Sequence, residues 1–141
     1  MVGIRKPLLR TAVVIGLVAF AFAFGPGDIA IDSIQFDLRT IGESVYEAHA
    51  RSGLWPRRIG DLEGTAYLKM PYRRWELERG GFVVVWHEDL DSNPAGNRDR
   101  VLAYDNGSLF ARLGIVWVCR GDLRVERIGR QELAALKARK P

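Results

Sequence analysis

The chain has 141 residues, with 21 lysine and arginine residues against 17 aspartate and glutamate residues, and a formal net charge of +4. Three of the basic residues lie within the first ten positions, which leaves 18 basic against 17 acidic residues in the remainder. This balance, without a basic stretch interleaved with aromatic residues, argues against nucleic-acid binding. The single cysteine, Cys119, excludes an internal disulfide and is expected to be a core residue, because it lies in an apolar run.

An uncharged run over residues 11–27 predicts a membrane anchor. A helix over residues 8–25 would be ~27 Å long at ~1.5 Å per residue, close to the ~30 Å of a hydrocarbon core. Because basic residues stay in the cytoplasm, we expect a cytoplasmic N-terminus and an outer domain formed by residues 28–141. The residues on which this orientation rests are Arg5, Lys6 and Arg10 before the run, and Asp28, Asp32 and Asp37 after it.

The same segment also fits a cleavable signal peptide, which would release a small secreted or periplasmic binding module. The alanines around Phe20 and Phe22 provide two candidate cleavage sites of the A-x-A type. Together with Phe24, these phenylalanines lengthen the apolar run beyond what a signal peptide needs, which favours the anchor. The mature N-terminus would distinguish the two.

Apolar residues at alternating spacings of three and four predict an amphipathic helix over residues 32–50. Its stripe consists of Ile31, Ile34, Leu38, Ile41 and Val45. Gly42 is a weak point of this helix, and His49, in the last turn, is expected to pack or cap rather than to bind a ligand. Pro56 turns the chain, so that Trp55 can fold back on the helix.

Alternation with a period of two predicts a strand over residues 73–78, with Trp75 and Leu77 on one face. Two glycines at 80–81 would join it in a hairpin to a second strand at residues 82–87. Residues 115–119 resemble that second strand in being apolar throughout.

Strands that are apolar on both faces need cover on both sides of the sheet. The helix over residues 32–50 would provide one cover, and either a C-terminal helix carrying Leu133 and Leu136 or a partner molecule would provide the other. Further strands are expected at residues 100–104 and, as an edge strand, at 123–128.

The Asn106-Gly107 pair leaves two alternatives open. It forms either a tight hairpin between residues 101–104 and 109–112 or a plain loop. In either case the elements predict one α+β domain: a helix packed on an antiparallel sheet of four or five strands, with a short C-terminal helix.

With these elements in place, the chain resembles the bacterial type IV pilins and type II secretion pseudopilins. Residues 47–62 (EAHARSGLWPRRIGDL) are similar to a pseudopilin segment in which a helix ends at a small-Gly-x-aromatic-Pro turn. Residues 100–133 are similar to a C-terminal hairpin whose pattern is a histidine, nine residues and then Asp-Gly-His. The chain departs from that pattern at Arg112, Leu123 and Arg124, and it lacks the N-terminal prepilin peptidase motif Gly-Phe-Thr-Leu-Ile-Glu.

The resemblance implies a non-enzymatic protein that acts through protein contacts, as a divergent component of a secretion or pilus system. It places the chain in a bacterial inner membrane with a single pass, a periplasmic domain and pilin-like subunits among its partners.

An acidic loop over residues 88–99 is a candidate calcium site, since hard oxygen ligands at alternate positions can converge from a curving loop. The ligand candidates are Asp89, Asp91 and Asn93. The loop is not an EF-hand, because Pro94 stands where that loop needs glycine and Arg100 where it needs glutamate. The alternative is a solvated loop without an ion.

His87 lies beside the same carboxylates, but no nucleophile signature or glycine-rich phosphate loop accompanies it. We therefore expect no enzymatic activity and no small-molecule substrate. Of the four tryptophans, Trp55, Trp75, Trp86 and Trp117, most are expected in the core. One or two of them on an exposed sheet face would form a partner-binding patch.

Overall fold

The computed structural model describes residues 26–139, so that the predicted anchor over residues 11–27, and the signal peptide that is its alternative, lie almost entirely outside the described residues. Within the described part, no helix has the length and apolar character that crossing a membrane requires. The chain divides into two units, Met1–Ser33 and Ile34–Pro141, and the second carries the sheet and the core.

The predicted amphipathic helix is confirmed as α2 (Pro26–Ser52). It begins six residues before the predicted start at Asp32, because a proline is tolerated in the first turn of a helix, where its missing N–H has no intrahelical partner. Its buried side chains are Asp37, Leu38, Thr40, Ile41, Ser44, Val45 and Ala48. Gly42 lies where the helix comes closest to the sheet, since a Cβ there would meet Cys119 Sγ at 2.7 Å.

Four antiparallel strands form one sheet in the order β1-β2-β3-β4. They are β1 (Phe82–Val84), β2 (Val101–Asp105), β3 (Ile115–Arg120) and β4 (Val125–Gly129). Since each strand pairs with the next along the chain, the sheet is a simple meander. The predicted α+β class and the predicted edge strand at the end of the sheet are confirmed.

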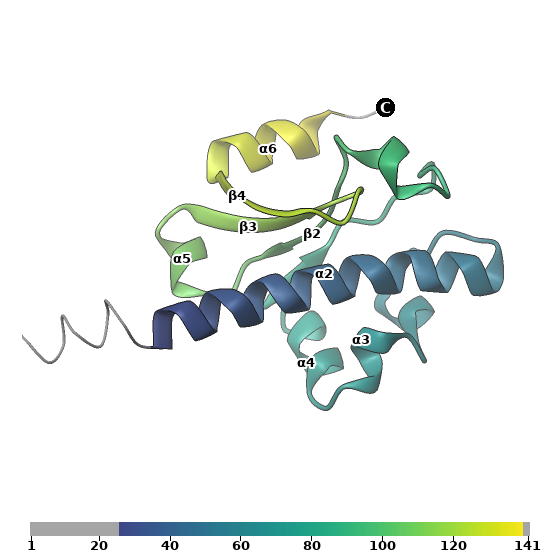
Figure 1. The fold of residues 1–141 in the computed structure, drawn as a ribbon, viewed down its shortest axis with the longest axis horizontal. Helices are drawn as coiled ribbons and strands as arrows, with labels where there is room; N and C mark the ends of the chain where they lie inside the picture. Colours follow the sequence, from purple (N-terminus) through teal and green to yellow (C-terminus); the bar gives the residue numbers. More distant parts are fainter. Residues whose placement is uncertain (1–25, 140–141) are drawn as a thin grey trace, which may run out of the picture. The chain divides into compact units, whose positions relative to one another are not determined.

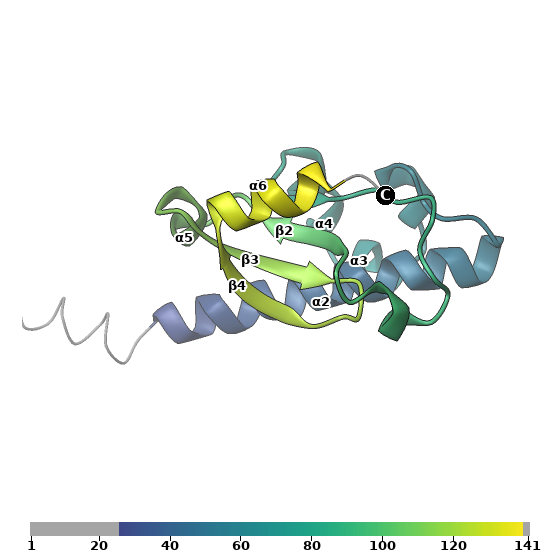
Figure 2. The same ribbon diagram turned by 90° about the horizontal axis from the view of Figure 1, so that it is seen from above.

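Helices cover both faces of this sheet, as Figures 1 and 2 show. On one face α2 contributes to the larger core, together with Leu102, Ala103 and Cys119 of the sheet. On the other, Leu133 of α6 (Arg130–Ala138) packs in a second cluster with Val101, Val116, Val118 and Ile128. The second cover is therefore the C-terminal helix, which decides between the two predicted alternatives.

The predicted strand over residues 73–78 is wrong, and with it the predicted hairpin across residues 80–81. The segment is the helix α4 (Arg73–Glu78). It contains no β-branched residue, and its charges pair at helical spacing, with Arg74 at 3.4 Å from Glu78 and Arg79 at 2.9 Å from Glu76. Three further short elements precede or follow it: η1 (Ile59–Leu62), α3 (Ala66–Lys69) and η2 (Pro94–Asn97).

Of the two alternatives at the Asn106-Gly107 pair, the hairpin between residues 101–104 and 109–112 is wrong. Residues after the Asn106-Gly107 pair form the short helix α5 (Leu109–Arg112), while β2 pairs with β1 and β3. Ser108 decides this, because its side chain accepts a hydrogen bond from the Ala111 N–H at 3.2 Å and so caps the helix start.

Candidate interaction surface

The outer side of α4 presents two aromatic side chains to solvent. Tyr72 is 83% and Trp75 57% exposed, and the guanidinium of Arg79 lies 4.4 Å from the centre of the Trp75 ring. Leu77, predicted on the same face as Trp75, is buried instead. We call Tyr72, Trp75 and Arg79 the α4 aromatic face; an exposed tryptophan was predicted only for a sheet face, and it lies on a helix.

Tyr72 has an unusual backbone conformation immediately before α4. Its φ is 65°, in the left-handed region. For a residue with a Cβ, this conformation costs roughly 1–2 kcal/mol. The surrounding structure holds this strained residue where its ring points into solvent, which is typical of functional positions rather than of core residues.

An ion pair between the helices fixes α4 to the domain. Arg73 Nη1 donates to Asp37 Oδ2 of α2 at 2.6 Å, and Asp37 is almost fully buried. The Arg73 guanidinium also lies 5.7 Å from the centre of the buried Tyr67 ring. Burial raises the pKa of Asp37, and the charge of Arg73 opposes that rise. The aromatic face is therefore carried by a firmly held helix.

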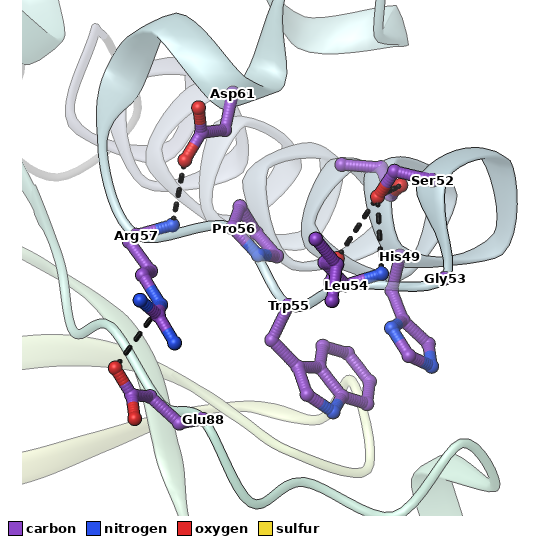
Figure 3. Close-up of a pocket in the computed structure, with 10 residues that line it drawn as sticks. His49, Ser52, Gly53, Leu54, Trp55, Pro56, Arg57, Asp61 and Glu88 are labelled. Carbon is purple, nitrogen blue, oxygen red and sulfur yellow. Dashed lines mark hydrogen bonds and ion pairs between the residues drawn. The ribbon is translucent and has the colours of Figure 1, made fainter.

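A second surface feature is a groove of about 580 Å³ at the end of α2, shown in Figure 3. The His49 ring stacks on Trp55 with 3.7 Å between ring centres, and Trp55 meets Tyr46 edge-on at 5.5 Å. The predicted packing role of His49 and the folding back of Trp55 are thus confirmed.

Polar groups around this groove pair with one another. Arg57 lies 3.1 Å from Glu88, and its backbone N–H donates to Asp61 at 2.9 Å. That hydrogen bond lowers the pKa of Asp61. These polar side chains therefore serve the turn, and Leu54 is an exposed apolar side chain in the lining of the groove.

Each candidate calcium ligand has a partner within or next to its own loop. Asp89 pairs with Arg100, the Asp91 carboxylate accepts from the Asn93 N–H at 2.8 Å, and Asn93 accepts from the Ala95 N–H at 3.1 Å. No group of three histidine, cysteine, aspartate or glutamate side chains within residues 26–139 is arranged to hold a metal ion. The calcium site therefore stays a prediction.

Thermal unfolding tests that prediction. Calcium at a free concentration of 100 times its dissociation constant would stabilise the domain by about 2.7 kcal/mol and raise the Tm. In Asp91→Asn, which keeps an acceptor for the Asn93 N–H but loses the charge, we expect this gain to fall. Equal Tm values in millimolar calcium and in chelator would rule out the site.

Asn97 positions this loop, and the sequence analysis did not predict that role. Its side chain donates to Tyr46 Oη and to the Asp91 carbonyl, both at 2.7 Å, and accepts from the Asp91 N–H at 2.9 Å. Tyr46 Oη in turn donates to the Gly121 carbonyl at 2.6 Å. No periodicity marks a buried asparagine in a polar loop, so no sequence signal could have found it.

His87 and Cys119 do not take part in a shared site. The His87 ring donates to the Val101 carbonyl at 2.8 Å, while its neighbour Glu88 pairs with Arg57. Cys119 is fully buried, and burial raises the pKa of its thiol to about 12. The predicted core role of Cys119 is confirmed.

Comparison with protein-family models, with curated proteins and with solved structures gives no match to this chain.

Proposed function

We propose that this chain is a membrane-anchored protein of pilin-like architecture whose outer domain acts through protein contacts, without enzymatic activity. The chain would lie in a bacterial inner membrane, with its outer domain in the periplasm. It would be a divergent component of a secretion or pilus system. The apolar run over residues 11–27 with its basic N-terminal flank supports the anchor. A long helix packed on an antiparallel sheet supports the architecture.

The observation that carries the protein-contact role is the α4 aromatic face. Tryptophan, tyrosine and arginine are the residues that most often dominate binding energy at protein interfaces. Here Trp75 lies on a short helix that Tyr72 precedes and Arg79 follows, and the inner side of this helix is fixed by Arg73 and Leu77. A rigidly held face of this composition can bind a protein partner with little loss of side-chain freedom.

Crosslinking in membranes, followed by purification of the full chain, tests the proposal. We expect Trp75→Ala to weaken partner capture by roughly thirtyfold, which corresponds to the ~2 kcal/mol of an interface hot spot. Phe36→Ala is the matched control, because Phe36 is a similarly exposed aromatic residue on α2. A deletion of residues 11–27 should abolish membrane recovery of the chain. Equal capture by wild type, Trp75→Ala and Phe36→Ala would contradict the assignment of the contact to α4.

A further inference from the structure

The corner between β2 and β3 presents apolar side chains to solvent. Leu109 and Leu113 are 62% and 70% exposed. The Leu113 N–H donates to the Leu109 carbonyl at 3.0 Å, so both side chains lie on the same side of one helical turn. Ile115 follows at the start of β3 and is also exposed. We call Leu109, Leu113 and Ile115 the α5 corner.

Hydrogen bonds to backbone carbonyl groups hold the corner in this conformation. The turn that ends α5 has Gly114 at φ 85°, and the Gly114 N–H donates to the Ala111 carbonyl at 3.2 Å. From α6, the Arg130 side chain donates to the same Ala111 carbonyl at 2.5 Å, and the Arg130 N–H donates to the Gly114 carbonyl at 3.3 Å. The leucines could turn inward only if these bonds broke, so their exposure is a property of the fold.

Positive charge accompanies the exposed leucines. Arg112 lies within α5, and Arg130 donates a hydrogen bond to the Ala111 carbonyl of α5. Both arginines are exposed. Among the acidic side chains of the flanking elements, Asp105 is buried and accepts from Ser108, and Glu126 and Glu132 pair with Arg120. Apolar side chains beside arginines fit the boundary between acyl chains and anionic headgroups of a bilayer.

The α5 corner lies at the same end of the sheet as Ile34 of α2. Gly42 approaches Cys119, and Tyr46, one turn later, bonds to Gly121, so α2 and β3 run in the same direction. Ile115 therefore belongs to the same end of the domain as Ile34. Figures 1 and 2 both place α5 at that end of the sheet.

The length of chain between the apolar run and Ile34 limits the distance between Ile34 and the membrane. The apolar run ends at Gly27, seven residues before Ile34. At a maximum of ~3.6 Å per residue, these residues span no more than ~25 Å in any conformation. A bilayer that holds residues 11–27 must then lie within that distance of Ile34.

We propose that the α5 corner inserts into the interfacial layer of the bilayer that holds residues 11–27, with anionic lipid headgroups beside Arg112 and Arg130. The inference rests on the proposed membrane anchoring. It gives the domain a second attachment to the lipid, so that the domain has a fixed orientation while the α4 aromatic face stays available to a protein partner.

Fluorescence of a labelled full chain in vesicles tests the inference. A polarity-sensitive dye is attached to Leu113→Cys, while buried Cys119 stays unlabelled in the folded chain. In vesicles of phosphatidylcholine and phosphatidylglycerol, we expect the emission to shift to shorter wavelength and to be quenched by nitroxide lipids. Leu54→Cys is the matched control, because Leu54 is 74% exposed in the turn after α2; its dye should show neither effect.

Each other outcome overturns a defined part of the inference. A vesicle-bound chain whose dye at position 113 stays in water would overturn the insertion and leave the anchoring intact. A spectral shift without nitroxide quenching would mean that a protein, such as a second copy, covers the corner. An equal shift in pure phosphatidylcholine would overturn the role of anionic headgroups. A chain that does not sediment with vesicles would overturn the anchoring and the insertion together.

Discussion

We expect the substitution Gly121→Ala to lower the free energy of unfolding by about 3 kcal/mol, the upper end of the usual cost of overpacking. A Cβ at position 121 would overlap the carbonyl oxygen and the Cβ of Asn97. Neither atom can move freely, because the Asn97 side chain is held by Tyr46 and by the backbone of Asp91. The acidic loop would therefore have to separate from the turn between β3 and β4.

Urea unfolding of the full chain in detergent, followed by tryptophan fluorescence, measures this loss. Gly129→Ala is the matched control, since a Cβ there meets no atom within 4 Å and the φ of −78° suits any residue. The control should change by less than ~1 kcal/mol, because the smaller entropy of alanine in the unfolded chain is opposed by its weaker preference for the N-cap of α6. Similar unfolding midpoints for the two variants would show that the contact between Asn97 and Gly121 is not close in solution.

The second large effect is expected from Arg73→Met, which removes the partner of buried Asp37. Breaking a buried ion pair typically costs 3–5 kcal/mol, because one charge stays buried without compensation. Arg73 is partly exposed, with 26% of its side chain accessible, so we expect a smaller loss of about 2 kcal/mol at pH 7. Arg74→Met is the control: its side chain is about half exposed and pairs only with exposed carboxylates, so the stability should change little.

The pH dependence of this loss distinguishes charge pairing from packing. Burial raises the pKa of Asp37 above its unfolded value of 3.8, so its contribution to stability is fully present below pH 3.8 and is lost as the pH rises through the folded pKa. Without Arg73 that pKa should rise further. The deficit of Arg73→Met should thus shrink as the pH falls towards 4, and Asp37→Asn should remove most of it at pH 7. A deficit independent of pH would instead assign the role of Arg73 to packing on Tyr67.

The comparison of β3 with α4 shows why one segment was predicted correctly and another was not. In β3, an unbroken apolar run with β-branched residues fits a strand buried on both faces, and the fold provides that burial. In α4, Trp75 and Leu77 alternate with charged residues, and this pattern fits either a strand or a short helix. The ion pair of Arg73 with Asp37, 36 residues away, fixes the helix to α2.

The sequence by itself determined the amphipathic helix α2, the strands β2 to β4, the C-terminal helix and the buried position of Cys119. Each of these follows from a periodicity or an apolar run within one segment, where burial of a continuous face dominates the free energy. Only the tertiary structure decided the orientation of Trp75 and the anchoring of the acidic loop. Asn97 and Tyr46 bond across 51 residues, and Tyr46 and Gly121 across 75. Such contacts depend on which backbone and side-chain groups the fold brings together, and that information is not contained in the spacing of residues along the chain.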